Sequence, residues 1–305
     1  MKIAVFGANG YIGRHLVYSF LESNEFEIFG FDIQESSFFD ETKNYSYTSI
    51  DIRNQERLSQ LNLNFDLLFY FSGITGTGIA FTEYEKFISV NEIGFLNLLE
   101  TLKINNLKPK IIFPSTRLVY KGKSKPLKEE DEKEFKTIYA LNKYNGEQYL
   151  KMYHNYFGID FLIFRICVPY GNVFNSQVSY GTIGFFLKSI QTKSAITLYG
   201  DGSQRRTFTH VLDICSQIIA ASTQSEQTNQ VYNIGGEPFS LNEIAVTFSD
   251  YFNISINHIE WPELALKMES GDTVFDESKI SELINYKLQH NLKSWIEGIA
   301  NVDKV

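Results

Sequence analysis

The sequence predicts an α/β fold, a doubly wound parallel sheet (Rossmann) with a second, smaller C-terminal domain. Six apolar runs without polar alternation are separated by segments with helical spacing, and a G-x-x-G-x-x-G spacing follows the first run. After Gly171 this alternation gives way to short, mixed patterns. We therefore expect one domain over 1–167 with about 208–235, and a smaller one over 168–207 with 236–305.

Each of the first three predicted strands ends at a residue suited to contact a ligand. The three apolar runs are 3–6, 26–31 and 47–50. They end at Gly7, Asp32 and Asp51, and the segment 11–21 between the first two has the apolar spacing of a helix. Because the carboxyl ends of parallel strands meet at one edge of a sheet, we expect a ligand site at that edge.

Three further runs continue the same alternation. They are 67–71, 110–114 and 160–166. Between them, residues 84–105 carry apolar side chains at steps of three, and a long helix is expected over about 135–157. In the smaller domain the last helix is expected near 292–300.

Composition excludes several classes of function. The 305 residues carry a formal net charge of −8, which argues against a general nucleic-acid surface. The two cysteines, Cys167 and Cys215, have no metal-ligand spacing, so we expect neither a disulfide framework nor a metal site, and a reducing cytoplasm fits. We expect no membrane span and no signal peptide, because the apolar runs are short and interrupted by charges.

The glycine spacing at 7–13 predicts a loop in which backbone amides and a helix N-terminus approach a pyrophosphate. Asp32 stands 19 residues beyond Gly13, where a carboxylate accepts hydrogen bonds from adenosine ribose hydroxyls and repels a 2'-phosphate. We therefore predict NAD as the cofactor. The cofactor contacts expected from these strand ends are Gly7, Asn9, Gly10, Tyr11, Ile12, Gly13, Asp32, Ile33, Asp51 and Ile52.

Tyr139 and Lys143 stand four residues apart in the long predicted helix, and therefore on one face of it. A phenol has a pKa of about 10 in isolation, and a fixed positive charge nearby lowers that pKa. Tyr139 is thus a candidate general base. This pair follows a strand that ends at Ser115 and Thr116, where such sheets present their ligands.

In these residues the chain resembles the extended short-chain dehydrogenase/reductase family, in its nucleotide-sugar epimerase/dehydratase branch, over nearly its whole length. Four motifs carry the resemblance: the glycine loop; S-T-R-L-V-Y at 115–120 with Y-A-L-N-K at 139–143; R-I-C-V-P-Y-G at 165–171; and the segment 199–213 followed by Y-N-I-G-G at 232–236. The resemblance implies an NAD enzyme that acts on nucleotide sugars in cell-surface polysaccharide synthesis, and a smaller domain that binds the nucleotide sugar.

The resemblance also assigns roles to residues. Tyr139 is implied as the acid/base, Lys143 as the residue that holds the nicotinamide ribose and lowers the Tyr139 pKa, and Thr116 as the residue that aligns the sugar hydroxyl. The further cofactor contacts implied are Phe71, Ser72, Gly73, Asn91, Ser115, Tyr139, Lys143 and Cys167. The substrate contacts implied are Thr75, Thr116, Arg117, Tyr139, Val168 and Arg206, of which Arg206 matches the residue that grips the nucleotide diphosphate.

Three positions depart from the family pattern. Val168 replaces a usual Asn, Thr207 replaces a common Asp, and Glu269 opens the segment that reads R-p-x-D in the family, so a second phosphate-binding Arg is missing. The predicted scaffold is unaffected by these changes. The sugar, the nucleotide base and the reacting carbon are left open.

The resemblance favours an epimerase, in which Tyr139 takes the hydroxyl proton while enzyme-held NAD accepts a hydride, and both are then returned to the opposite face. A 4-keto-sugar reductase that draws on a diffusible NAD(P)H is the alternative. Dehydratase chemistry is disfavoured because Arg117 and Leu118 stand where that branch has carboxylates. A non-catalytic NAD-binding protein would lose the Tyr or the Lys, and both are present. A homodimer through 84–105 and 135–157 is also implied.

Overall fold

A computed structural model describes residues 1–174, 181–224, 226 and 228–302, and the chain divides into two compact units. The first unit comprises 1–119, 135–165 and 218–232, and the second comprises 120–134, 166–217 and 233–305. The predicted domain bounds differ from these units in four segments, which all lie in the second unit: 120–134, 166–167, 208–217 and 233–235.

The first unit is built on a seven-stranded sheet in its described residues. Its strands are β1 (Lys2–Phe6), β2 (Glu27–Asp32), β3 (Tyr45–Ser49), β4 (Leu67–Tyr70), β5 (Lys110–Thr116), β6 (Phe161–Ile166) and β10 (Gln230–Asn233). They lie in the order β3-β2-β1-β4-β5-β6-β10, and the pairings from β3 to β5 are all parallel. This arrangement confirms the prediction of a doubly wound parallel sheet, to which β10 adds a strand that the apolar runs did not indicate.

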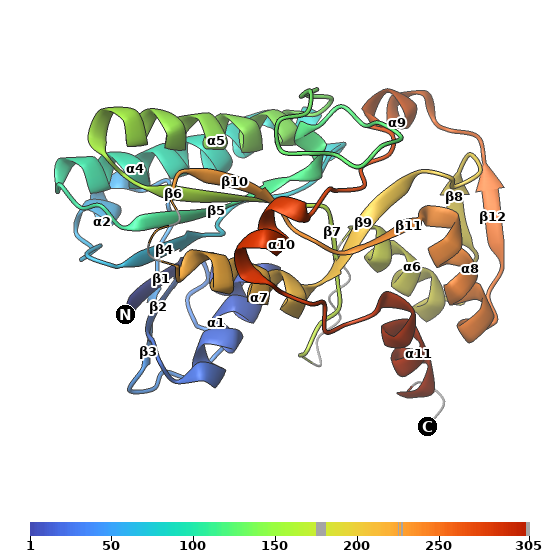
Figure 1. Ribbon diagram of the computed structural model, residues 1–305, viewed down its shortest axis with the longest axis horizontal. Coiled ribbons are helices and arrows are strands. Elements are labelled where there is room, and N and C mark those ends of the chain that lie inside the picture. Colours follow the sequence, from blue (N-terminus) through green and yellow to red (C-terminus); the bar gives the residue numbers. More distant parts are fainter. Residues whose placement is uncertain (175–180, 225, 227, 303–305) are drawn as a thin grey trace. The chain divides into compact units, whose positions relative to one another are not determined.

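Helices cover both faces of this sheet (Figure 1). They are α1 (Tyr11–Ser23), α2 (Gln55–Ser59), α3 (Tyr84–Ile88), α4 (Gly94–Ile104) and α5 (Ile138–Phe157). In Figure 1, α2, α4 and α5 lie on one face of the sheet and α1 lies on the other. Since β4 and most of β1 are buried along their length, their residues must be apolar on both sides, which is why these strands read as uninterrupted apolar runs.

The strand order places a topological switch point between β1 and β4. From β1 the chain runs outward to β2 and β3, then returns to β4 on the other side of β1. Ligands of open α/β sheets bind at such a crevice, beyond the carboxyl ends of the strands. Here that position lies between the loop after Phe6 and the loop after Tyr70.

The helix expected over 84–105 is divided by a π-helical turn, Ser89–Ile93, which separates α3 from α4. A π-bulge inserts one residue into the helical repeat and is frequent at functional sites. The period of the apolar residues did not reveal this turn. It contains Asn91, one of the predicted cofactor residues.

The second unit contains two small sheets. The three-stranded sheet has the order β11-β9-β7, and a parallel pair joins β12 to β8. The strands are β7 (Val168–Tyr170), β8 (Ile196–Tyr199), β9 (Arg205–His210), β11 (Glu237–Ser240) and β12 (Ile256–Ile259). The helices are α6 (Gly181–Gln191), α8 (Leu241–Phe252), α9 (Glu263–Met268), α10 (Ser278–Ile284) and α11 (Leu292–Val302), while α7 (Val211–Ser222) passes from the second unit to the first.

Backbone hydrogen bonds explain why 120–134 belongs to the second unit. The amide of Leu127 donates to the carbonyl of Val274, and the amide of Gly122 donates to the carbonyl of Ser270. The side chain of Tyr120 donates to Asn233 over 2.6 Å. These contacts join residues more than a hundred positions apart, so the local sequence pattern could not indicate them. Within the described residues, no helix is both long and apolar enough to span a bilayer.

Candidate active site

The glycine loop after β1 leaves no room for side chains at two positions. A Cβ on Gly13 would lie 1.9 Å from the carbonyl oxygen of Gly7, and a Cβ on Gly7 would lie 2.6 Å from the backbone of Phe71. Gly7 also has a φ of +81°, which side-chain-bearing residues rarely adopt. The loop therefore packs directly against the chain that leaves β4.

The N-terminus of α1 suits an anion. Its N-cap, Gly10, makes no side-chain capping hydrogen bond, and the first turn holds no acidic residue. The helix starts at Tyr11, and its first-turn amides, such as those of Ile12 and Gly13, have no acceptor within the helix. Together with the positive end of the helix dipole they suit a phosphate. These residues fit the pyrophosphate of a dinucleotide.

Asp32, at the end of β2, is joined to this loop. Its carboxylate accepts hydrogen bonds from the amide of Asn9 over 3.1 Å and from the amide of Gln34 over 3.3 Å. The Asn9 side chain donates to the carbonyl of Ser36 and accepts from the amide of Phe38. Asn9 therefore braces the loop after β2, and any contact it makes with a cofactor falls to its backbone. Ile33 is 63% exposed beside Asp32 and offers an apolar surface to a base.

Asp51 and Ile52 are occupied in different ways. Asp51 makes a two-bond pair with Arg53, whose guanidinium hydrogen bonds lower the pKa of that carboxyl. Ile52 is buried, and a Cβ on Gly94 would lie 2.7 Å from its side chain. If adenine is contacted at the end of β3, the contact must therefore be made by the backbone of this segment or by the exposed side of the Asp51–Arg53 pair.

The segment after β4 is held by Asn91. The Asn91 side chain accepts from the amide of Ile74 over 2.8 Å and donates to the carbonyl of Ile74 over 3.0 Å. This pair of bonds imitates a strand pairing and fixes the chain that contains Phe71, Ser72 and Gly73 opposite the glycine loop. Asn91 therefore holds the segment after β4 in place through Ile74. The next residue, Thr75, is exposed.

Tyr139 and Lys143 lie at the start of α5, the helix that packs on β5. Thr137 caps this helix by accepting from the amide of Ala140 over 3.1 Å. Gly146 allows the close approach, because a Cβ there would lie 2.4 Å from the ring of Phe113 in β5. As α5 runs back along the sheet, its first turn comes to the carboxyl end of β5, the end that carries Thr116.

Lys143 is only 8% exposed, and its ammonium lies 4.9 Å from the centre of the Phe113 ring. Burial lowers the pKa of Lys143 to about 8, because desolvation penalises the charged form. A lysine with this pKa is still mostly protonated at neutral pH. It therefore supplies a positive charge one helical turn from the phenol of Tyr139, which is half-buried.

The two hydroxyls at the end of β5 have different partners. Ser115 donates to Glu147 over 2.5 Å inside the first unit, so its side chain belongs to a buried network. Thr116 is 7% exposed, and its oxygen accepts from the amide of Leu118 at 3.3 Å, which leaves its proton for another acceptor. Arg117 follows and opens the 3-10 turn Arg117–Val119.

Sequence reasoning missed the network that anchors α5. Arg165 donates to Glu147 over 2.9 and 2.6 Å, and both side chains are buried. The only signal in the sequence was the presence of Arg165 within an apolar run. A second network joins α5 to the π-helical turn, where Glu92 accepts from Asn145 over 3.2 Å and from Tyr149 over 2.7 Å. Burial and Glu92 together raise the pKa of Tyr149 to about 12.

Three predicted residues lie in the second unit. Cys167 is buried, and its thiol donates to the carbonyl of Thr273 over 3.3 Å. Val168 is buried at the start of β7. Arg206 is buried in β9 and donates to Glu269 over 2.9 Å.

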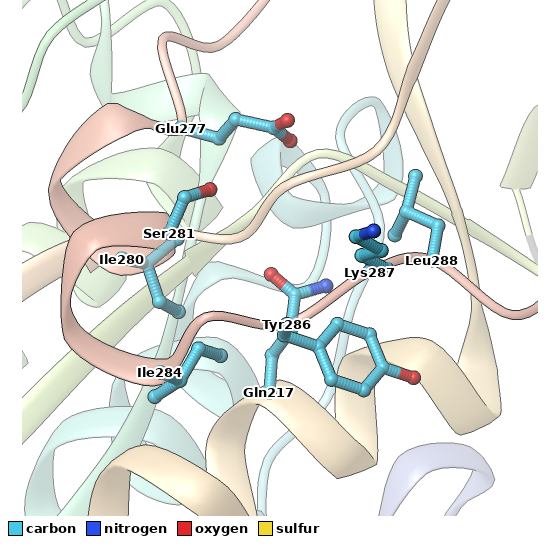
Figure 2. Close-up of a pocket in the computed structure, with 8 residues that line it drawn as sticks. All are labelled: Gln217, Glu277, Ile280, Ser281, Ile284, Tyr286, Lys287 and Leu288. Atoms are coloured by element: carbon cyan, nitrogen blue, oxygen red, sulfur yellow. The ribbon is translucent and has the colours of Figure 1, made fainter.

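The second unit also holds a cavity of about 310 Å³. It lies between α10 and the segment that follows it, with Gln217 of α7 on its wall (Figure 2). The carboxylate of Glu277 on its rim accepts from the amide of Gly236 over 2.9 Å. None of the predicted site residues lines this cavity. In the described part of the chain, no group of three His, Cys, Asp or Glu residues is placed to hold a metal ion.

Comparison with known proteins gives consistent matches over this chain. The model of the NAD dependent epimerase/dehydratase family matches residues 3–235. The CDP-paratose 2-epimerase of Salmonella typhi is 25% identical over 334 residues, 97% of this chain and 97% of that protein. The UDP-glucuronate 4-epimerase of Thermodesulfobacterium geofontis is 25% identical over 270 residues, 86% of this chain and 80% of that protein.

Among solved structures, the UDP-glucuronic acid 4-epimerase of Bacillus cereus, in complex with UDP-glucuronic acid and NAD, is 26% identical. The likeness covers 100% of this chain and 99% of that chain, with a TM-score of 0.86. The match therefore extends over both units of the fold.

Proposed function

The chain belongs to the NAD dependent epimerase/dehydratase family, and from that premise we propose that it is an epimerase of a nucleotide-diphospho-sugar. It is an enzyme that uses NAD, as the sequence predicted. The observation that carries the finer proposal is the buried Lys143, one helical turn from Tyr139 at the carboxyl end of β5, where Thr116 also lies.

The residues of the first unit suit NAD. The amides at the start of α1 and the tight turn of Gly7 and Gly13 hold the pyrophosphate, and Asp32 holds the adenosine ribose. Ser72 and Gly73, fixed by Asn91, border the same crevice. The bound NAD supplies a hydride acceptor that later returns the hydride. Lys143 donates to the nicotinamide ribose, and Ser115 and Cys167 are the remaining contacts that the resemblance proposes.

Tyr139 takes the proton of the reacting sugar hydroxyl and gives it back at the end of the cycle. The positive charge of Lys143 favours the phenolate, which makes Tyr139 a usable base near neutral pH. The hydroxyl of Thr116 donates to the same sugar oxygen and holds it in line with the phenol. The proton goes back to the oxygen from which it came, so that oxygen is unchanged. The configuration at carbon inverts because the hydride would return to the opposite face of the keto-sugar.

The nucleotide sugar is the proposed substrate class because the relatives include enzymes named for UDP- and CDP-sugars. Thr75 and Arg117 are proposed to border the sugar, and Val168 and Arg206 to border the nucleotide diphosphate. Arg206 is buried in β9, and its planar guanidinium suits a phosphate.

We also propose a homodimer, formed through α3 to α5. Large apolar side chains of these helices are exposed in the single chain: Tyr84, Ile88, Ile93, Leu141, Met152 and Tyr156. Burial of such a surface in a symmetric contact would remove it from water. A cytoplasmic location is proposed because Cys167 and Cys215 are both free and buried. A role in cell-surface polysaccharide synthesis is proposed from the resemblance alone.

The test of the proposed reaction uses the purified protein with its bound dinucleotide. UDP-, GDP-, CDP- and dTDP-sugars are offered without added cofactor, and products are separated by chromatography. We expect an epimer to form from at least one of them with no reductant consumed. Turnover that requires stoichiometric NADH or NADPH would instead identify a reductase of keto-sugars, and water loss would identify a dehydratase.

A further inference from the structure

Arg206 is a buried cation with an incomplete set of partners. The residue is 7% exposed in β9. One terminal nitrogen donates to Glu269 over 2.9 Å and the other donates to Thr182 over 3.4 Å. Its Nε is buried and, among the described residues, has no hydrogen-bond partner. A guanidinium presents five N–H donors, so this one is under-satisfied by protein groups.

Glu269 is held in place from two sides. One carboxylate oxygen accepts from Arg206, and the other accepts from the amide of Gly271 over 3.0 Å. The following residues are fixed to β9, since the amide of Arg205 donates to Asp272 over 2.8 Å and that of Thr273 donates to the carbonyl of Arg205. The carboxylate is thus presented to Arg206 by a backbone segment that is hydrogen-bonded to β9.

The chain before Glu269 is packed differently. Glu269 is the C-cap of α9, and none of the residues of α9 is buried. Leu264 and Leu266 of that helix are both more than half exposed. The Glu269 side chain can therefore rotate without disturbing buried contacts of α9, the helix that precedes it.

We infer that Glu269 lowers the affinity for the substrate by competing with its phosphate for Arg206. The inference rests on the proposed function, in which a nucleoside diphosphate reaches Arg206. A phosphate has several acceptor oxygens, so it can accept from the terminal nitrogens of Arg206 and also from its unpaired Nε. Glu269 accepts from Arg206 with one oxygen only. Binding must then displace a carboxylate that neutralises the cation, and that carboxylate repels the incoming phosphate.

This competition has a defined consequence. In place of a free cation, the site presents a neutral Arg206–Glu269 pair to the diphosphate, so the nucleoside diphosphate binds more weakly than it would to Arg206 alone. Removing the charge of Glu269 should strengthen binding of nucleoside diphosphates. Most of the gain must depend on Arg206, because competition for the cation ends when the cation is removed and only the direct repulsion between carboxylate and phosphate is left.

The experiment measures binding of UDP, CDP, GDP and dTDP by calorimetry to the NAD-loaded protein. For Glu269→Gln, which keeps the shape and an oxygen for the Gly271 amide, we expect the Kd of the best nucleotide to fall at least tenfold. Glu269→Ala is a second variant with the same expected direction. Glu263→Gln is the matched control, since Glu263 of α9 pairs with Lys267 on the surface, and its Kd should equal that of the wild type.

A double-mutant comparison separates competition from a change in packing. In an Arg206→Met background, Glu269→Gln should lower the Kd much less than it does with Arg206 present, because only the direct repulsion between carboxylate and phosphate is then relieved. An unchanged or raised Kd in both single variants, with nucleotide binding to the wild type intact, overturns the inference and leaves the proposed function standing. If none of the four nucleotides binds to the wild type or to either variant, the nucleotide-sugar proposal itself fails, and the inference fails with it.

Discussion

Arg165 and Glu147 form a two-bond ion pair in the interior of the first unit, with side chains that are 3% and 0% exposed. The guanidinium of β6 meets the carboxylate of α5, and Ser115 of β5 donates to the same carboxylate. The pair therefore links one helix to two neighbouring strands. Because Tyr139 and Lys143 lie on that helix, the ion pair fixes the position along the sheet of the face of α5 that is proposed to be catalytic.

Breaking this pair is expected to destabilise the fold strongly. Arg165→Met or Glu147→Leu leaves one buried charge without its partner, which costs about 3 to 5 kcal/mol. The double variant should cost clearly less than the sum of the two, since no unpaired charge is left. Urea unfolding monitored by circular dichroism measures each value.

The surface pair Lys86–Glu83 provides the control for the buried pair, since both side chains are well exposed. Lys86→Met should change the free energy of unfolding by less than about 1 kcal/mol. Additive losses in the Arg165 and Glu147 double variant would contradict the interpretation of the pair as a coupled buried contact.

Gly13→Ala tests the glycine loop. The added Cβ would lie 1.9 Å from the carbonyl oxygen of Gly7, so Gly7 and the start of α1 must move apart. We expect NAD affinity to fall by at least about tenfold, because the amides of the loop lose their common orientation. Fluorescence titration of NAD after removal of the bound dinucleotide measures this loss.

Gly298 in α11 is the matched helical glycine, since nothing lies within 4 Å of a Cβ built there. Gly298→Ala should keep NAD affinity and stabilise the chain by about 0.5 to 1 kcal/mol, because alanine loses less entropy in a helix. Equal NAD affinity in the Gly13→Ala protein would refute the role of the tight turn.

Local patterns predicted the first unit better than the second for a physical reason. The strands β1 and β4 are covered by helices on both faces, so burial forces a continuous apolar run that can be read directly. The strands β7 and β11 have only three or four residues, and their pairing depends on contacts with distant segments. Length alone is not the reason, because β4 also has only four residues. The difference is that β11 lacks the continuous apolar run of β4, and a proline lies within both β7 and β11.

The candidate site shows the same limit. Tyr139 and Lys143 could be placed on one helical face, because four residues of helix fix their relationship. The pairing of Ser115 with Glu147 joins residues 32 positions apart, and that of Arg206 with Glu269 joins residues 63 positions apart. Neither contact has a local signature. The sequence indicated a missing arginine at Glu269 but not that its carboxylate would occupy Arg206.

Burial of Lys143 predicts a specific dependence of stability on pH. Burial lowers the pKa of Lys143 to about 8 in the folded chain, from its ordinary value of 10.5. The unfolded chain therefore binds more protons between these values, and stability rises with pH across that window. Below pH 8 the full cost of the buried charge is present, about 3 kcal/mol from the size of the shift.

Lys143→Met removes the buried charge and should stabilise the cofactor-free protein by about 3 kcal/mol at pH 7. This advantage should shrink as the pH is raised from 8 towards 10.5, because the wild-type lysine becomes neutral. Urea unfolding at a series of pH values measures it. Lys43→Met, at an exposed lysine, is the matched control for the loss of a surface side chain. A constant advantage for Lys143→Met would show that the burial cost does not arise from charge.

Tyr139→Phe separates chemistry from binding. The phenol is the group proposed to carry the proton, and its loss leaves the ring, the helix and Lys143 in place. We expect turnover to fall by about 10² to 10⁴ fold, the range typical of a lost general acid/base, while NAD affinity stays within about a factor of two. Tyr144→Phe on the same helix is the control. The Tyr144 ring lies 4.7 Å from that of Phe135, and this contact does not need the hydroxyl, so turnover should be retained.

If Tyr139→Phe keeps wild-type turnover, the proton must leave by another residue. Thr116 would then be the next residue to substitute, because its hydroxyl lies at the end of the strand on which α5 packs.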